Sequence, residues 1–178
     1  MRLTACFAVL ALLAAAPAMA QTAAPSPAQT PSPPGLAIAD VSAWIASKGG
    51  EVQPVQRSGD DVWLTVKDGD MTWLIFFYGC VADVCGDMQY AASFSNPTIT
   101  QTMVNGWNRE RRFLKAAFFP GADGQDPSAI VQYDLLLGPS GVEQLTDPTA
   151  VWIDMVAAFA THVGFYKPAP EAAPATGQ

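Results

Sequence analysis

Histidine, basic residues and cysteine are all scarce in this chain of 178 residues, and each shortage argues against a class of function. The single histidine, His162, would have to serve any catalytic triad or histidine-based metal site, and its place in the last turn of a predicted helix favours a structural role. Nine Lys and Arg residues against sixteen Asp and Glu residues give a net charge of −7 at pH 7. We do not expect so acidic a chain to bind nucleic acid or anionic membranes.

The acidic residues form no recognisable ion-binding or catalytic pattern. None of the aspartates in the predicted turns follows the D-x-[DN]-x-[DN]-G order of a calcium-binding loop. Paired carboxylates for glycoside chemistry would need facing positions on rigid elements, whereas these residues gather in turns. We therefore expect no metal, no cofactor and no enzymatic activity. The aspartates concerned are Asp60, Asp61, Asp68, Asp70, Asp123 and Asp126.

The N-terminus has the three parts of a secretory signal peptide. Met1 and Arg2 form a short basic start, the run from Ala5 to Ala16 is apolar and uncharged, and Ala18-Met19-Ala20 supplies the small residues of a cleavage site. We predict a signal peptide over residues 1–20, cleavage after Ala20, and a periplasmic or secreted protein. The apolar run is too short for a retained transmembrane helix, so the mature chain is not expected to insert into a membrane.

Cleavage would change both the charge and the cysteine count of the chain. Cys6 lies in a sequence that resembles a lipobox, but no hydrophobic segment precedes it, so a lipoprotein is disfavoured. Removing Arg2 from the nine basic residues leaves eight against sixteen acidic ones, a charge near −8. Cys80 and Cys85 then remain as an even pair in an oxidising compartment, and we predict that they form a disulfide.

The spacing of this cysteine pair, CVADVC, differs from the C-x-x-C of redox enzymes and zinc knuckles. A structural disulfide is favoured, with a redox or a metal-binding role as the alternatives. In the chain-entropy model, closing so small a loop stabilises the fold by about 2 kcal/mol.

Segments rich in Pro and Ala lie at both ends of the mature chain. Residues 21–35 carry no charge, and residues 167–178 repeat the Pro/Ala pattern. Neither composition can bury a core, so we predict a disordered linker and a disordered tail. The folded unit then covers residues 36–166, a length that suits one hydrophobic core.

The stretch from Met71 to Phe94 organises this folded unit as two strands joined by a short loop. Six consecutive apolar or aromatic residues from Trp73 to Tyr78 predict a strand that is buried on both faces and central in a sheet. Residues 88–94 place Met, Tyr, Ala and Phe on one face and smaller or polar residues on the other, which predicts a half-exposed strand.

Periodicity and turn residues predict the other elements. Asp40 and Asp147 are expected to cap the first and last helices, and Asn96 the middle one, while Asp68-Gly69 predicts a tight hairpin turn. The predicted class is α+β, an antiparallel sheet of about six strands flanked by helices in the order α-ββββ-α-ββ-α. The expected helices are 41–48, 98–111 and 148–166, and the strands are 51–56, 62–67, 73–78, 88–94, 113–119 and 129–137.

The last predicted helix is the longest, and we expect it to lie across the sheet. Apolar residues recur along it at intervals of four, which predicts the stripe that faces the core. The stripe is Val151, Met155, Phe159 and Val163, widened by Trp152 and Val156.

The segment from Val104 to Phe118, VNGWNRERRFLKAAF, resembles the helix-to-strand signature V-N-x-W-N-x-x-x-R-F of the YbjN family, described as bacterial sensory transduction regulators. FFYGC, CGDMQYAASF and the segment from Leu145 to Phe165 match the same pattern, so the resemblance covers essentially the whole folded unit. It implies a fold similar to the type III secretion chaperones. It carries over no catalytic residues. The export signal departs from the cytoplasmic name-bearing member, which argues against a cytoplasmic signalling role.

Two groups of residues are candidates for binding. Four of the eight basic residues of the mature chain lie within seven positions; charge complementing a helix C-terminus is the favoured explanation, with a site for an anion or acidic partner as the alternative. The aromatic residues exceed what one face of a small sheet needs, so they either pack in the core or form an open binding surface. The basic candidates are Arg109, Arg111, Arg112 and Lys115, and the aromatic candidates are Trp63, Trp73, Tyr78 and Tyr90.

Two functional hypotheses follow. The first is an exported, non-enzymatic domain that binds a protein partner or forms a homodimer through its sheet or a helix-flanked groove, in envelope stress or regulation. The second is a small-molecule or envelope-stress sensor with a pocket between the sheet and the helices. A flat exposed patch would favour the first hypothesis, and an enclosed apolar cavity would favour the second.

Overall fold

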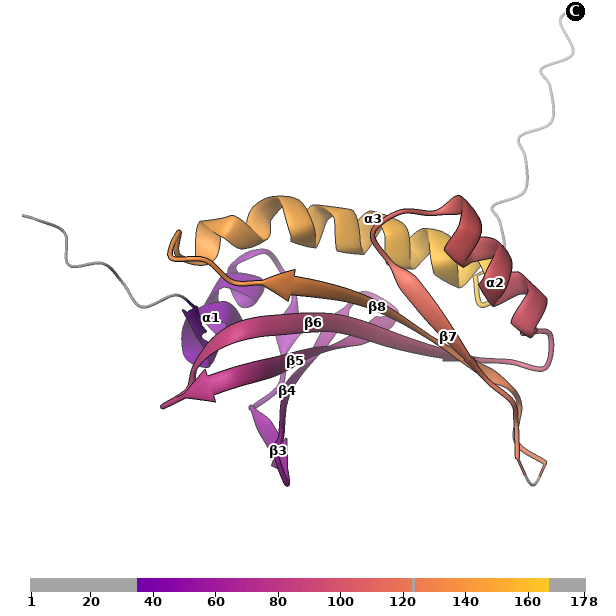
Figure 1. Cartoon of the computed structure of the whole chain (residues 1–178), viewed down its shortest axis with the longest axis horizontal. Helices are drawn as coiled ribbons and strands as arrows, with labels where there is room; N and C mark the ends of the chain where they lie inside the picture. The colour runs from indigo at the N-terminus through magenta and orange to yellow at the C-terminus, as the bar shows by residue number, and fades with distance from the viewer. Residues whose placement is uncertain (1–34, 123, 167–178) are drawn as a thin grey trace, which may run out of the picture. The chain divides into compact units, whose positions relative to one another are not determined.

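The structure, a computed structural model, describes residues 35–122 and 124–166. The predicted signal peptide (1–20), the predicted linker except Gly35, the predicted tail (167–178) and Asp123 lie outside the described residues. The described residues form one antiparallel sheet and three α-helices (Figure 1), so the predicted α+β class is confirmed.

The predicted order of elements is confirmed in outline, with three differences. A two-residue strand precedes the first helix, two short strands replace the one predicted over 51–56, and a 3₁₀ helix precedes the last α-helix. The elements are β1 (Leu36–Ala37), α1 (Ile38–Ser47), β2 (Glu51–Val52), β3 (Gln56–Ser58), β4 (Asp61–Asp68), β5 (Met71–Val81), β6 (Val84–Ser95), α2 (Gln101–Glu110), β7 (Lys115–Phe119), β8 (Ser128–Leu136), η1 (Val142–Leu145) and α3 (Thr146–His162).

The sheet has the strand order β2-β4-β5-β6-β8-β7, with β1 paired to β6 and β3 paired to β4. All of these pairs are antiparallel. The prediction of a two-residue turn between β4 and β5 is confirmed, because β4 ends at Asp68 and β5 begins at Met71. β5 lies between β4 and β6, which confirms that the strand from Trp73 to Tyr78 is interior to the sheet.

The helices cover only one face of the sheet (Figure 1). On β5, Trp73, Ile75 and Phe77 are buried toward the helices, whereas the alternating Leu74 and Phe76 are only half-buried on the other face. The prediction that this strand is buried on both faces is therefore wrong. A run of apolar residues gives no sign of which face lacks a covering layer.

Helix α3 lies along the sheet and supplies much of the core. Trp152, Val156 and Phe159 are fully buried, whereas Val151 and Met155 of the predicted stripe are only half-buried. The prediction therefore placed the centre of the stripe one residue too early. A strict row of fourth residues drifts around a helix of 3.6 residues per turn, so the buried face alternates between steps of four and three.

The predicted helix caps are wrong at all three helices. Asp40 and Asp147 lie inside the first turns of α1 and α3, where a carboxylate still complements the helix dipole but does not cap it. α2 begins after Thr100, whose Oγ1 accepts a hydrogen bond from the backbone N–H of Met103 at 3.2 Å. Asn96 instead donates from Nδ2 to the carbonyl oxygen of the residue after α3 at 2.9 Å, tying the β6–α2 loop to the end of that helix.

The end of α2 covers the start of the outer edge of β7. Trp107 donates from Nε1 to the carbonyl of Leu114 at 3.2 Å, and Asn108 bonds both the N–H and the carbonyl of Ala116 at 2.9 and 2.8 Å. These side chains satisfy backbone groups that would otherwise be free to pair with another strand. Trp107 and Asn108 are the W-N pair of the signature noted in the sequence, which gives that pair a structural role.

Candidate functional site

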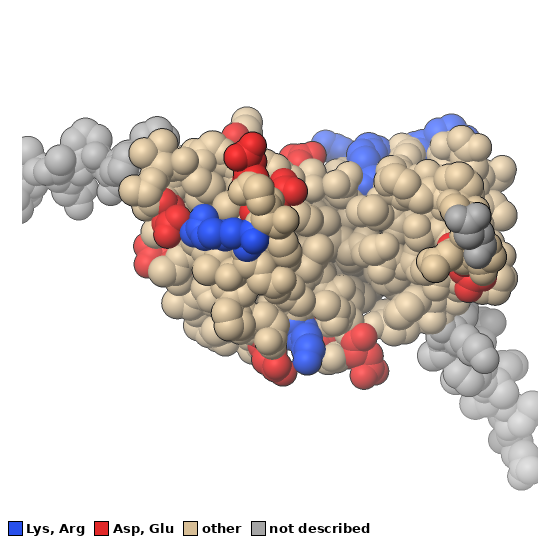
Figure 2. Space-filling view, turned by 90° about the horizontal axis from the view of Figure 1, so that it is seen from below, with Lys and Arg blue, Asp and Glu red and all other residues tan. Residues whose placement is uncertain are grey.

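The face of the sheet opposite the helices, here called the open face, presents apolar side chains from adjacent strands. Trp63 of β4 and Phe76 of β5 are direct cross-strand partners, with ring centroids 6.3 Å apart. Leu74 is likewise paired with Ala91 of β6. Figure 2 shows this side of the molecule, where a centre free of charged side chains is bordered by charged ones. An apolar centre with a polar border is typical of an interaction surface.

A shallow hollow of about 190 Å³ lies on the open face. Its sides include Leu74 and Phe76 from β5 and Ile130 from β8, and Ala91 lies between these strands. Since Ala91 carries only a methyl group, the hollow exists because its neighbours on both sides are larger. It is large enough for a side chain of another molecule.

A row of amides lies beside this hollow and gives the open face a polar half. Gln132 donates from Nε2 to Gln89 at 2.9 Å, and Gln89 donates from Nε2 to the Asp134 carboxylate at 2.6 Å. These side chains bond one another across β6 and β8, so the row is ordered without a ligand.

The four predicted aromatic surface residues do not share a face. Trp63 and Tyr78 lie on the open face, but Trp73 is 2% and Tyr90 0% exposed under α3, so including those two in a surface was wrong. Trp73 contacts Tyr90 and Trp152 with ring centroids 5.2 and 5.8 Å apart. Alternation along β5 and β6 puts every second aromatic residue into the core.

The two tyrosines differ in environment accordingly. Burial raises the pKa of Tyr90 to about 12, and its hydroxyl lies 2.6 Å from Oγ1 of Thr149. Tyr78 is 43% exposed. Its pKa is also raised, first by desolvation and then by the carboxylates of Asp134 and Asp61. Neither hydroxyl is therefore poised to act as a base near neutral pH.

The predicted basic cluster is exposed, but its geometry differs from the prediction. α2 ends at Glu110, so Arg112 lies beyond the helix and does not share a helical face with Arg109. Lys115 donates from Nζ to the carbonyls of Asn108 and Arg111 at 2.9 and 2.7 Å, which complements the C-terminus of α2. This supports the helix-terminus explanation for Lys115.

Two of the three arginines of the cluster lie over aromatic rings. Arg111 is 5.5 Å from the ring centroid of Trp107, and Arg112 is 5.3 Å from that of Phe113. Within the described residues, the ion pairs are Arg57 with Asp83 and Lys67 with Glu51, so none involves the cluster. A site for an acidic partner here stays a prediction.

His162 joins α3 to α2. Its Nε2 lies 2.9 Å from the carbonyl oxygen of Met103, and because a carbonyl only accepts hydrogen bonds, Nε2 carries the proton. The ring also contacts Trp107 and Phe159. In the part of the chain that the structure describes, no three His, Cys, Asp or Glu side chains are placed to hold a metal ion. No helix in that part is long and apolar enough to cross a membrane.

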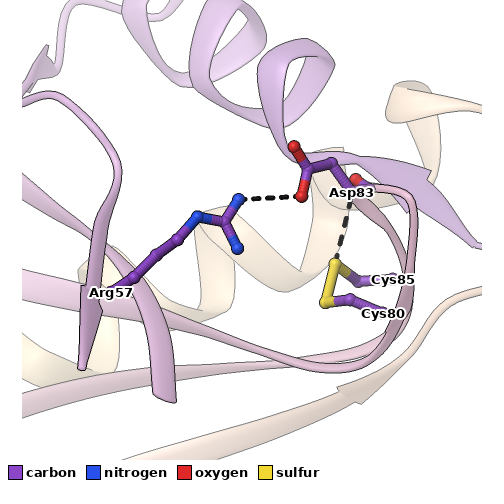
Figure 3. Close-up of a disulfide and its surroundings, with 4 residues drawn as sticks. All are labelled: Arg57, Cys80, Asp83 and Cys85. Carbon is purple, nitrogen blue, oxygen red and sulfur yellow. Dashed lines mark hydrogen bonds and ion pairs between the residues drawn. A yellow bond between two sulfur atoms is a disulfide. The ribbon is translucent and has the colours of Figure 1, made fainter. Parts of the chain in front are cut away.

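A second concave region, here called the α1 groove, has a volume of about 410 Å³. It lies between the start of α1 and the segment Val52–Val55, with Leu64 of β4 in its lining. Arg57 of β3 and Asp83 of the β5–β6 turn also line it, and Arg57 Nη2 lies 2.8 Å from Asp83 Oδ1 (Figure 3). This pair could not be predicted from the sequence, because its members are 26 positions apart and no local pattern links them.

The predicted cysteine pair lies directly beside that turn. Cys80 and Cys85 are cross-strand partners with Cα atoms 3.9 Å apart, and the structure joins their sulfur atoms (Figure 3). This pairing explains why the cysteines are five positions apart. Cys80 and Val81 end β5, a two-residue turn follows, and Val84 and Cys85 begin β6.

The described fold is that of a small α+β domain with a single sheet and helices on one side. A family model described as YbjN, "putative bacterial sensory transduction regulator", matches residues 37–165. The chain belongs to the YbjN family, which confirms the resemblance seen in its sequence and makes it a regulator-like domain.

One solved structure is similar, described as "Crystal structure of YbjN, a putative transcription regulator from E. coli". It is 15% identical, and the match covers 67% of this chain and 87% of that one with a TM-score of 0.43. Comparison with curated proteins finds no match.

Proposed function

We propose that this chain is an exported, non-enzymatic regulator-like domain that binds a protein partner through its open face. The observation that carries the proposal is the one-sided helix layer, which leaves Trp63, Leu74 and Phe76 without a covering element in the described chain. A folded domain gains nothing in stability from leaving such side chains partly exposed to water, so we infer that the cost is offset by binding.

Export and the disulfide are part of the same proposal. The apolar run and the Ala18-Met19-Ala20 site support cleavage after Ala20, and the paired Cys80 and Cys85 suit an oxidising compartment. Mass spectrometry of protein recovered from a bacterial envelope fraction tests both points. The expected mass lacks residues 1–20 and rises by about 2 Da on reduction, because two S–H bonds form. Recovery of a chain that retains Met1, or of two free thiols, would contradict the proposal.

Site-specific crosslinking tests the binding surface. A photoreactive phenylalanine derivative at Phe76 is expected to give light-dependent adducts in intact cells, and the same group at Ala158, an exposed residue of α3, is the matched control. Adduct masses separate a second copy of this chain from a different protein. Equal adduct formation at the two positions would reject the open face as the site.

Filling the hollow sharpens that test. Ala91→Phe should place a ring where the partner side chain binds and so reduce adducts from Phe76 several-fold, whereas Thr72→Ser on the same face but outside the hollow should not. Circular dichroism and thermal unfolding verify that both variants fold. Undiminished crosslinking by a folded Ala91→Phe chain would show that the hollow does not contact the partner.

A sensor is the second candidate function, and the α1 groove favours it. Its volume of about 410 Å³ falls in the range of small-ligand sites, and Ile38, Val55 and Leu64 give it an apolar lining. The dye anilinonaphthalene sulfonate serves as the probe, and Val55→Trp should abolish its fluorescence gain by filling the groove. Since this variant lies away from the open face, it should leave crosslinking at Phe76 unchanged. If Val55→Trp abolished crosslinking at Phe76 but kept dye binding, the α1 groove would be the partner site and would not be the dye site.

A further inference from the structure

The turn between β5 and β6 has a backbone conformation that alanine, one of its two residues, does not favour. Ala82 and Asp83 have φ values of 48° and 65°, the left-handed region in which a Cβ atom is crowded. Two-residue turns of this kind normally contain Asn and Gly. The β4–β5 turn of the same sheet does use glycine, with Gly69 at φ 59°. Something besides local preference must therefore hold Ala82 in this conformation.

The cysteine pair is in the right place to hold the turn. Cys80 and Cys85 are register partners on the two strands, and only Val81 and Val84 separate them from the turn residues. Cys80 is half-buried and Cys85 is 0% exposed, so Cys80 is the more accessible residue of the pair. A small thiol reagent would therefore attack from the Cys80 side.

Asp83 connects this turn to two other segments. Its carboxylate pairs with Arg57 of β3 at 2.8 Å, and its carbonyl oxygen accepts a hydrogen bond from the N–H of Ile38 at 3.0 Å (Figure 3 shows the first). Ile38 is the first residue of α1, and no side chain caps that helix. The turn carbonyl thus satisfies a donor that a capping side chain would normally take.

The residues just before α1 also contact the β5–β6 hairpin. Leu36 of β1 pairs with Cys85, and a Cβ atom on Gly35 would lie 2.5 Å from the Cys85 carbonyl oxygen. β1, the start of α1 and β3 therefore all meet the hairpin within two residues of its disulfide. Arg57 and Asp83 also line the α1 groove, so the position of the turn sets its shape.

We propose that Cys80–Cys85 is a redox-sensitive latch that holds the start of α1 and fixes the shape of the α1 groove. A dithiol reductant breaks the S–S bond, the two cysteines take up two protons and two electrons as thiols, and the reductant becomes its own disulfide. The freed turn leaves the left-handed region, so Asp83 moves away from Ile38 and Arg57. The groove then loses its shape, because two of its lining residues have moved, while the rest of the sheet stays folded. This inference does not depend on partner binding at the open face.

Hydrogen exchange of the full mature chain with and without dithiothreitol tests the latch. Reduction should speed exchange in a peptide covering residues 36–47 at least tenfold, while a peptide from the middle of α3 should change less than twofold. An unchanged 36–47 peptide in a chain with two thiols would overturn the proposal. Equal acceleration everywhere would overturn it as well, because the bond would then stabilise the whole fold rather than one corner.

Variants separate the turn from the bond itself. Cys80→Ser/Cys85→Ser should reproduce the reduced pattern without reductant. Adding Ala82→Asn, a residue that tolerates left-handed φ, should restore at least half of the lost protection, with Ala46→Asn on the exposed side of α1 as the matched control. Rescue by both substitutions, or by neither, would contradict the turn-based mechanism.

Discussion

The two faces of the sheet are built from the same strands but differ in what covers them. On the inner face, Trp73 and Tyr90 contact each other and Trp152 of α3, and all three are at most 2% exposed. On the open face, Trp63 and Phe76 contact each other across two strands but have no helix above them. The apolar content of a strand therefore does not decide whether a residue belongs to the core. The covering layer does, and we expect stability to depend on the inner face and binding on the open one.

The largest expected effect is on the inner face, at Trp152. Trp152→Ala removes a fully buried ring from between Trp73 and Tyr90, and we expect it to lower the free energy of unfolding by about 3–5 kcal/mol because a cavity remains. Urea unfolding followed by circular dichroism measures the change. Ala157→Ser, on the exposed side of the same helix, is the control and should have little effect. A loss below about 1 kcal/mol at Trp152 would mean that the two faces do not differ in this way.

The next largest effect on stability is expected at the edge of the sheet, where Asn108 covers part of β7. Asn108→Ala leaves the N–H and the carbonyl of Ala116 without their side-chain partner, which should cost about 1–3 kcal/mol. It also frees the edge of β7 for pairing with other chains, so aggregation on concentration should increase, as light scattering would show. Asn105→Ala, exposed on the same helix, is the matched control. Similar behaviour of the two variants would rule out edge protection by Asn108.

The sequence predicted what depends on local pattern. Alternation and turn residues located the strands. The turn that Asp68-Gly69 predicted lies between β4 and β5 and consists of Gly69 and Asp70; it could be predicted because a tight turn needs only neighbours in sequence. Helix caps were misplaced because Asp40 and Asp147 serve equally well inside a first turn, so their presence alone does not fix the first residue of a helix.

The candidate sites were less predictable because they depend on long-range arrangement. The sequence marked Trp63 and Tyr78 as aromatic candidates, but separating them from Trp73 and Tyr90 requires the strand register and the side on which the helices pack. Because Trp73 and Tyr78 are five positions apart on one strand, alternation alone places them on opposite faces. Nothing local indicates which face is open, and nothing local brings Arg57 to the β5–β6 turn.

A smaller effect, on the inner face, concerns Tyr90. Burial raises its pKa from 10.0 to about 12, so an unfolded chain loses this proton at a lower pH than the folded one. The stability that this difference contributes is complete below pH 10 and is lost as the pH rises toward 12. Tyr90→Phe should lower stability by about 1 kcal/mol at pH 7, because the bond to Thr149 is lost.

The pH dependence distinguishes this effect from a simple packing defect. Between pH 10 and 12 the Tyr90→Phe chain should lose less stability than the natural one, because its buried ring has no proton to release. Tyr78→Phe, on the open face, is the matched control and should change the slope less. Parallel stability curves for the natural chain and Tyr90→Phe over this range would contradict a raised pKa at Tyr90.

The smallest effect on stability is expected at Phe76, where the effect on binding should be large. Phe76→Thr keeps a residue that suits a strand and removes one side of a single ring contact with Trp63, so we expect a loss below about 1 kcal/mol. The same variant should lose most of the partner crosslinking measured from a probe at Trp63, because the apolar centre of the open face is broken. If Phe76→Thr destabilises the chain as much as Trp152→Ala does, the open face serves the fold rather than a partner. If Phe76→Thr changes neither stability nor crosslinking, the half-buried ring of Phe76 serves neither the fold nor a partner. The two faces would then differ only in whether helices cover them.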